Sequence, residues 1–96
     1  FAPRTNSWGF DNKTCAYRLV NHSAAVARIE CRVPGADVNP HLALAAVLAA
    51  GRAGIEHALV PTAPVSGDAA APEAPQGPAW PPDFAAAIAA WRTSMF

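Results

Sequence analysis

The sequence predicts a mixed α/β fold of the α+β kind, and three observations carry this prediction. Hydrophobic and polar residues alternate over residues 14–33, as in a β-hairpin with one covered face. An Ala- and Leu-rich run over residues 39–58 has the length and composition of a helix. A Pro-rich segment, residues 60–82, separates this run from a second helical stretch at residues 83–93.

The predicted hairpin consists of two strands, residues 14–20 and 26–33, which the turn-forming residues 21–25 connect. Successive side chains of a strand point to opposite faces, so each strand has two distinct sides. The side of the second strand that we expect to face the core carries Ala27, Ile29, Cys31 and Val33. The opposite side carries Val26, Arg28, Glu30 and Arg32.

The helix at residues 39–58 has a clear start. Asn39 is a favoured N-cap residue, and Pro40 suits the first helical position, where its missing N–H has no helical partner to lose. The run is apolar nearly all round, which predicts a buried helix rather than a surface helix. Gly51 and Gly54 weaken its middle, and we expect them to permit close packing there.

Proline and other loop formers shape the rest of the chain. Most of the ten prolines lie in residues 60–82, so we expect an extended surface segment there. Residues 1–11 are rich in loop formers and are predicted to be irregular. Phe84, Ile88 and Trp91 stand at helical spacing, which gives the second helix a narrow apolar stripe.

Composition narrows the class of protein. The 96 residues include seven basic and seven acidic ones, and this balance favours neither nucleic acid nor an anionic membrane as a partner. The longest apolar run, Leu42–Ala50, is far shorter than the roughly 20 residues that cross a bilayer. Position 1 is not Met and no signal peptide is visible, and we expect a cytoplasmic location. Charged residues make up only 15%, against about 25% in ordinary domains, which suits a piece covered by a larger protein.

Arg28, Glu30 and Arg32 form a charged row on one side of the second strand. Alternate residues of a strand stand about 7 Å apart, so the row is about 13 Å long, and Arg18 of the first strand can join it. One interpretation is a solvated face with a cross-strand ion pair. The other is an anion site, because arginine forks bind phosphate and carboxylate in pairs and a carboxylate can hold a divalent cation. Spacing alone leaves both interpretations open.

Two strings make the chain recognisable. "WGFDNKTCAYRLV" and "RIECRVPGADVNPHLALAAVLAAG", followed by "GIEH", resemble the C-terminal part of the catalytic domain of the glutamine synthetase family. The branch that includes the gamma-glutamylpolyamine synthetases is the most similar, with a pattern close to D-N-R-T-C-x-x-R and R-x-E-x-R-x-P-G-A-D-x-N-P-Y-L-A-L-A-A. The match is specific from Trp8 to His57, and the last residues resemble a later family helix.

The resemblance implies a role for each charged residue. Glu30 aligns with a carboxylate that binds an active-site Mg²⁺ or Mn²⁺. Arg32 aligns with a catalytic arginine that contacts the glutamate substrate and the phosphorylated intermediate. Arg18 and Arg28 align with arginines around the ATP phosphates. Lys13 stands where the family has a catalytic arginine near the transferred phosphoryl group, and it keeps the charge while losing the two-pronged guanidinium.

The reaction and the partners also follow from the resemblance. Family enzymes use ATP to phosphorylate the γ-carboxylate of glutamate, and ammonia or a primary amine then displaces phosphate to make an amide. Their active sites are completed by other parts of the chain and by a neighbouring subunit, so a homo-oligomer is implied.

The match covers only a partial piece of that domain. The family's other metal ligands lie upstream of the matched region, and a single carboxylate, Glu30, does not make a magnesium site. We therefore expect the 96-residue chain to be inactive by itself. The alternative function is that of a catalytically incompetent remnant or interaction piece of a larger enzyme.

Overall fold

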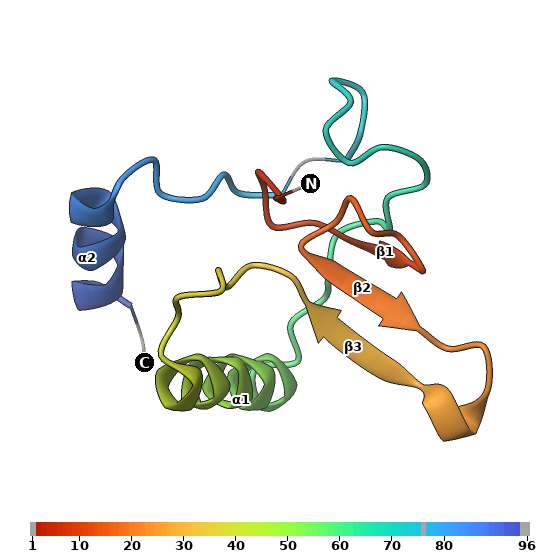
Figure 1. Cartoon of the computed structure of the whole chain (residues 1–96), viewed down its shortest axis with the longest axis horizontal. Coiled ribbons are helices and arrows are strands. Elements are labelled where there is room, and N and C mark those ends of the chain that lie inside the picture. Colours follow the sequence, from red (N-terminus) through yellow and green to blue (C-terminus); the bar gives the residue numbers. More distant parts are fainter. Residues whose placement is uncertain (1, 76, 95–96) are drawn as a thin grey trace. The chain divides into compact units, whose positions relative to one another are not determined.

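The computed structural model describes residues 2–75 and 77–94. Its fold is mixed α/β, with a three-stranded sheet and two helices (Figure 1). In chain order the elements are β1 (Trp8–Phe10), β2 (Tyr17–Val20), a 3₁₀ turn (Ala24–Val26), β3 (Arg28–Cys31), α1 (Pro40–Glu56) and α2 (Phe84–Arg92). The chain divides into two compact units, which are described separately. The first unit comprises Phe1–Val33 and Thr62–Trp80, and the second comprises Pro34–Pro61 and Pro81–Phe96.

The sheet of the first unit has the order β1-β2-β3. Strand β2 pairs antiparallel with β3, and Arg18 lies opposite Glu30 in this pairing. Strand β1 pairs parallel with β2, and Trp8 lies beside Tyr17. The expectation that residues 1–11 are irregular is therefore wrong for β1. Its three residues contain a glycine and are too few to show an alternating pattern, so no local signal in the sequence reveals its pairing with β2.

The β2–β3 hairpin is shorter than the sequence predicted. Val26 belongs to the 3₁₀ turn, where its N–H donates to the Ser23 carbonyl at 3.1 Å, so β3 begins only at Arg28. The side of β3 that was expected to face the core is also not covered throughout. Ile29 is 72% exposed, whereas Cys31 is partly buried.

The core of the first unit lies beneath the Pro-rich segment. Cys15 is fully buried and packs with Val65 and Ala69, which are also buried. The Val65 N–H donates to the Trp8 carbonyl at 2.8 Å, and the Trp8 indole N–H donates to the Thr62 carbonyl at 2.8 Å. This part of the Pro-rich segment is thus docked on β1, with Val65 and Ala69 buried, while most of its other described residues are exposed, as predicted for a surface segment. The docking uses the Thr62 carbonyl and the Val65 N–H, which belong to non-proline residues and so remain available within a Pro-rich segment.

Helix α1 of the second unit starts where the sequence predicted. The Asn39 side chain accepts hydrogen bonds from the N–H groups of His41 (3.0 Å) and Leu42 (3.3 Å), and Pro40 takes the first helical position. The prediction of a buried helix is wrong for the chain by itself. Leu48 is 72% exposed and Ile55 is 84% exposed. An all-round apolar helix needs cover on every side, and 96 residues do not provide it.

Helix α2 is the second helix predicted from the sequence, and it runs from Phe84 to Arg92. The Asp83 carboxylate caps it by accepting a hydrogen bond from the Ala86 N–H at 2.8 Å. Its apolar stripe is largely open, since Phe84 is 82% exposed and Trp91 is 72% exposed. Among the described residues, no helix is both long enough and apolar enough to span a membrane.

Candidate functional site

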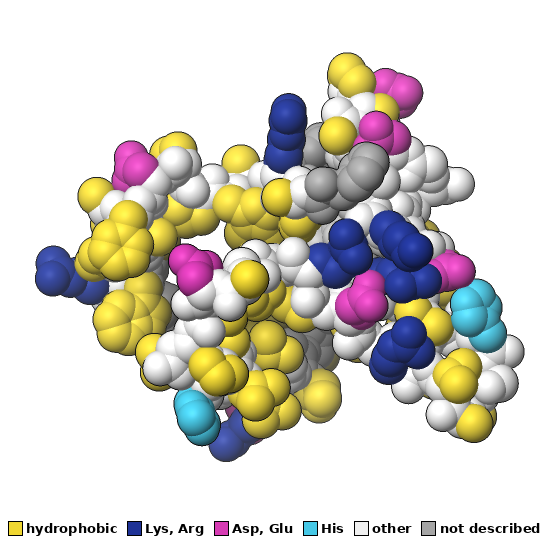
Figure 2. Space-filling view, viewed as in Figure 1, with side chains coloured by type: hydrophobic (Ala, Val, Ile, Leu, Met, Phe, Trp, Pro, Cys, Tyr) yellow, Lys and Arg dark blue, Asp and Glu magenta, His cyan; other side chains and the backbone are white. Residues whose placement is uncertain are grey.

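The β2–β3 hairpin brings together three of the predicted site residues. The register places Arg18 directly opposite Glu30, with Arg32 two residues further along β3's direction. An Nη1 atom of Arg18 lies 3.4 Å from Glu30 Oε2, and an Nη1 atom of Arg32 lies 3.5 Å from the same oxygen. Figure 2 shows basic and acidic side chains gathered on this part of the first unit. Two guanidinium groups therefore converge on one carboxylate, as the charged row suggested.

Arg28 and Lys13 lie at the margins of this charged group. Arg28 stands opposite Val20, is exposed, and donates to the Val26 carbonyl at 3.2 Å. Lys13 is exposed in the turn between β1 and β2, and it joins none of the ion pairs found among residues 2–75 and 77–94. Both cations remain available to an incoming anion.

Asp11 is a member of the site that sequence reasoning missed. Its Oδ1 accepts a hydrogen bond from Arg18 Nε at 2.7 Å and a second one from Arg18 Nη2. Its Oδ2 lies 3.3 Å from His22 Nε2. Asp11 reaches Arg18 because β1 pairs parallel with β2 and the Asp11 N–H continues this ladder to the Leu19 carbonyl at 2.9 Å. The sequence alone does not predict β1, the strand that positions Asp11, because its three residues are too few to show an alternation of polar and apolar side chains.

The electrostatics keep this group ionised at neutral pH. Hydrogen bonds from Arg18 lower the pKa of Asp11 below its ordinary value, and they outweigh the opposing effect of burial. Partial burial raises the pKa of Glu30, but the hydrogen bonds and charges of Arg18 and Arg32 outweigh it, so the net shift is downward. The Asp11 carboxylate in turn raises the pKa of Arg18. The face thus presents fixed charges rather than a proton donor or acceptor.

The described residues of this chain do not form a metal site by themselves. No group of three His, Cys, Asp or Glu side chains with metal-binding geometry exists among residues 2–75 and 77–94. Glu30 is a single carboxylate, and its Oε2 already faces two guanidinium groups. Since Mg²⁺ needs further oxygen ligands, Glu30 can supply at most one part of such a site.

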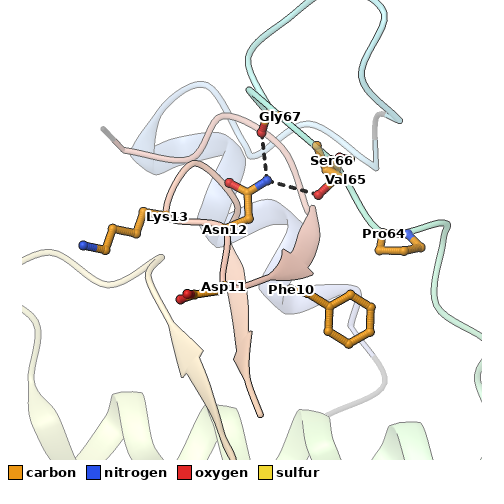
Figure 3. A pocket seen from close by; sticks show the side chains of 8 residues that line it. All are labelled: Phe10, Asp11, Asn12, Lys13, Pro64, Val65, Ser66 and Gly67. Atoms are coloured by element: carbon orange, nitrogen blue, oxygen red, sulfur yellow. Dashed lines mark hydrogen bonds between the residues drawn. The ribbon is translucent and has the colours of Figure 1, made fainter. Parts of the chain in front are cut away.

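A hollow of about 520 Å³ adjoins the charged face (Figure 3). It lies between the turn after β1 and the Pro-rich segment, and its lining residues are Phe10, Asp11, Asn12, Lys13, Pro64, Val65, Ser66 and Gly67. The Asn12 side chain points toward the Pro-rich segment, whereas the Lys13 side chain extends away from it (Figure 3). The hollow therefore has a cation at one margin and main-chain groups of the Pro-rich segment along the other.

The family follows from comparison with known proteins. The profile of the catalytic domain of glutamine synthetase matches residues 1–96, so the chain belongs to this family. A glutamate–isopropylamine ligase from a Pseudomonas species is 46% identical over 69 residues, which cover 72% of this chain and 15% of that protein. The gamma-glutamylethanolamide synthetase of Streptomyces coelicolor is 51% identical over 69 residues, with the same coverage.

A glutamine synthetase from Pyrococcus furiosus is more distant. It is 44% identical over 62 residues, which cover 65% of this chain and 14% of that protein. The chain thus spans about 15% of the length of the relatives that it matches. No solved structure matches the chain at a significant level.

Proposed function

We propose that this chain forms one wall of the active site of an ATP-dependent ligase that joins glutamate to ammonia or an amine. The reaction would proceed through γ-glutamyl phosphate, and the amine would displace phosphate to form a γ-glutamyl amide. The observation that carries the proposal is the convergence of Arg18 and Arg32 on Glu30, in a chain of the glutamine synthetase family. Phosphoryl transfer needs this kind of surface, because positioning and charge neutralisation make up most of its catalysis.

The proposed roles divide the charged residues by their place on the face. Arg18 and Arg28 would bind the ATP phosphates, and Arg32 would hold the glutamate carboxylate and the acyl phosphate through paired N–H donors. Lys13 would neutralise the charge on the transferred phosphoryl group. Glu30 would contribute one ligand to a Mg²⁺ or Mn²⁺ ion whose other ligands lie outside this chain.

Two of the relatives favour an amine rather than ammonia as the second substrate, whereas the Pyrococcus furiosus relative is a glutamine synthetase. The two relatives with matches over 69 residues carry isopropylamine and ethanolamide in their names. We extend this to a small primary amine for the enzyme to which this chain contributes, including the polyamines of the branch that the sequence resembles. A homo-oligomeric assembly would supply the opposite wall of the site.

A chimeric enzyme tests the proposal. In the Pseudomonas glutamate–isopropylamine ligase, the stretch that aligns with this chain is replaced by the 96 residues of the chain. We expect phosphate release that depends on both glutamate and amine, and we expect Glu30→Gln or Arg32→Gln to reduce it at least about 100-fold, as losses of transition-state charge stabilisation do. Arg52→Gln, which removes an exposed ion pair with Glu56 at 2.7 Å on α1, serves as the matched control. A folded chimera whose activity survives Glu30→Gln and Arg32→Gln would refute the proposal.

The alternative function is a catalytically incompetent piece of a larger enzyme. It is favoured by the exposed apolar residues of α1, which another part of a protein would cover. For the 96-residue chain alone we predict no phosphate release dependent on glutamate and amine. Release by the purified chain that disappears in Glu30→Ala would contradict this prediction.

A further inference from the structure

Asn12 ties the turn after β1 to the Pro-rich segment. Its side-chain amide donates hydrogen bonds to the carbonyls of Val65 (3.1 Å) and Gly67 (2.8 Å), more than 50 residues away in sequence (Figure 3). Its Oδ1 accepts hydrogen bonds from the N–H of Thr14 at 3.0 Å and from the Thr14 hydroxyl at 2.7 Å. Both amide hydrogens of Asn12 thus bond to the Pro-rich segment, while its amide oxygen holds Thr14 in the same turn.

Thr14 makes a second connection to the same segment. Its Oγ1 accepts a hydrogen bond from the Ala69 N–H at 2.9 Å. The hydroxyl has one hydrogen, and the shorter of its two donor contacts, 2.7 Å against 3.3 Å to Gly67, assigns that hydrogen to Asn12. Beneath these bonds, Cys15 packs against Val65 and Ala69 in the core. Asn12 and Thr14 therefore form one hydrogen-bonded clamp with residues 65–69.

Lys13 stands between the two members of this clamp. Its side chain extends to the opposite side (Figure 3), so the clamp holds the Lys13 backbone without engaging its ammonium group. A lysine has a flexible four-carbon stem and no guanidinium fork that aligns itself on an anion. The position of its charge consequently depends on how firmly its backbone is anchored.

We propose that Asn12 and Thr14 are positioning residues, which hold Lys13 in place for phosphoryl transfer by clamping its turn onto residues 65–69. This inference rests on the proposed function, in which Lys13 faces the transferred phosphoryl group. It assigns a task to the Pro-rich segment, which supplies main-chain partners to the clamp and no side chain to the chemistry. Small displacements of a catalytic group are costly, since about 1 Å can cost about 100-fold in rate.

Amide hydrogen exchange in the 96-residue chain tests the clamp without any activity. Thr14→Val keeps the side-chain volume and removes the hydroxyl, so we expect exchange at the Ala69 N–H to rise roughly tenfold or more. The reference is the Arg32 N–H, which donates to the Ala16 carbonyl at 2.8 Å in the same unit and is expected to change less than about twofold. Thr14→Ser should retain the slow exchange of Ala69. No rise at Ala69, or an equal rise at both amides, would overturn the clamp.

Kinetics of the chimeric enzyme test the positioning role. We expect Thr14→Val to lower kcat about tenfold, with the KM values for ATP and glutamate changed less than about twofold. Thr14→Ser should restore the rate, and Thr62→Val, which alters an exposed threonine of the same unit, is the matched control. In a Lys13→Ala background the effect of Thr14→Val should nearly vanish, because the clamp acts through Lys13.

The outcomes separate the two proposals. If Lys13→Ala lowers kcat and Thr14→Val lowers it further by the same factor as in the parent, the clamp does not act through Lys13 and this inference fails alone. If Lys13→Ala leaves kcat unchanged, the role of Lys13 in the proposed function fails, and the positioning role fails with it.

Discussion

Gly9 offers the sharpest test of how the Pro-rich segment docks on β1. A Cβ added at this position would lie 2.6 Å from the Val65 carbonyl oxygen, 3.0 Å from Asn12 Cβ and 3.2 Å from Cys15 Sγ. Carbon and oxygen atoms ordinarily approach to about 3.3–3.6 Å, so in Gly9→Ala the two segments must separate by roughly 0.7–1.0 Å. The nearest atom belongs to the backbone and cannot rotate away.

This separation would lower the unfolding free energy of the chain. It would stretch the hydrogen bond from the Val65 N–H to the Trp8 carbonyl beyond its present 2.8 Å, to about the longest distance at which a hydrogen bond forms, and it would open the buried cluster around Cys15. Overpacking of this kind costs about 1–3 kcal/mol of unfolding free energy. For a chain of this size, each kcal/mol corresponds to about 4–8 °C, so we expect Tm to fall by roughly 5–20 °C.

Thermal and urea unfolding of the 96-residue chain measure this loss. The matched controls are Gly51→Ala and Gly54→Ala in α1, where nothing lies within 4 Å of the added Cβ. In a helix this substitution stabilises by about 0.5–1 kcal/mol, so the controls should move in the opposite direction. A Gly9→Ala variant with unchanged or higher stability would refute the close docking of residue 65 on β1.

Three further predictions concern acid stability, helix capping and thiol reactivity. The pKa of Asp11 is depressed in the folded chain, so its stabilising effect is present above its unfolded pKa of about 3.9 and is lost as the pH falls through the lower folded value. Asp11→Asn should therefore lose less stability than the parent on acidification below about pH 4 in urea titrations, and an equal loss would contradict the pairing with Arg18. Asn39→Ala removes the acceptor for two helical N–H groups and should cost about 1 kcal/mol, visible as lower helical circular dichroism; an unaltered spectrum and stability would count against the cap. Burial raises the pKa of the fully buried Cys15 thiol, so mass spectrometry of the folded chain should find iodoacetamide on Cys31 first; equal labelling rates would show that the Cys15 core is open.

Local chemistry made part of this fold predictable. Asn39 and Pro40 specify a helix start by themselves, since a side-chain acceptor and a fixed φ act on adjacent residues. The alternation of the predicted strand, residues 26–33, placed Glu30 and Arg32 on one side, and the antiparallel pairing of a short hairpin then brought Arg18 opposite Glu30. These relations span at most about a dozen residues, which is the range that periodicity and capping describe.

Other parts of the site depend on contacts that the local pattern does not reveal. Asp11 and Arg18 are near each other in sequence, but they meet through a parallel strand pair that neither periodicity nor turn composition indicates. Asn12 lies outside the predicted elements and the sequence predicts Thr14 in the first strand, whereas β2 begins only at Tyr17. The partners of both side chains lie more than 50 positions away among prolines and glycines. The docking of Val65 and Ala69 within residues 60–82 was missed because composition reports the absence of regular structure and not the presence of docking.

The sequence by itself determined the helix starts, the charged row on β3 and the glutamine synthetase family of the chain. Only the tertiary structure decided that Asp11 shares Arg18 with Glu30, and that Asn12 and Thr14 hold the turn of Lys13 against the Pro-rich segment. The physical reason is the range of the interactions. Backbone preferences and side-chain periodicity act over a few neighbouring residues, whereas hydrogen bonds and packing join whichever groups the folded chain brings within about 3 Å and 4 Å, respectively.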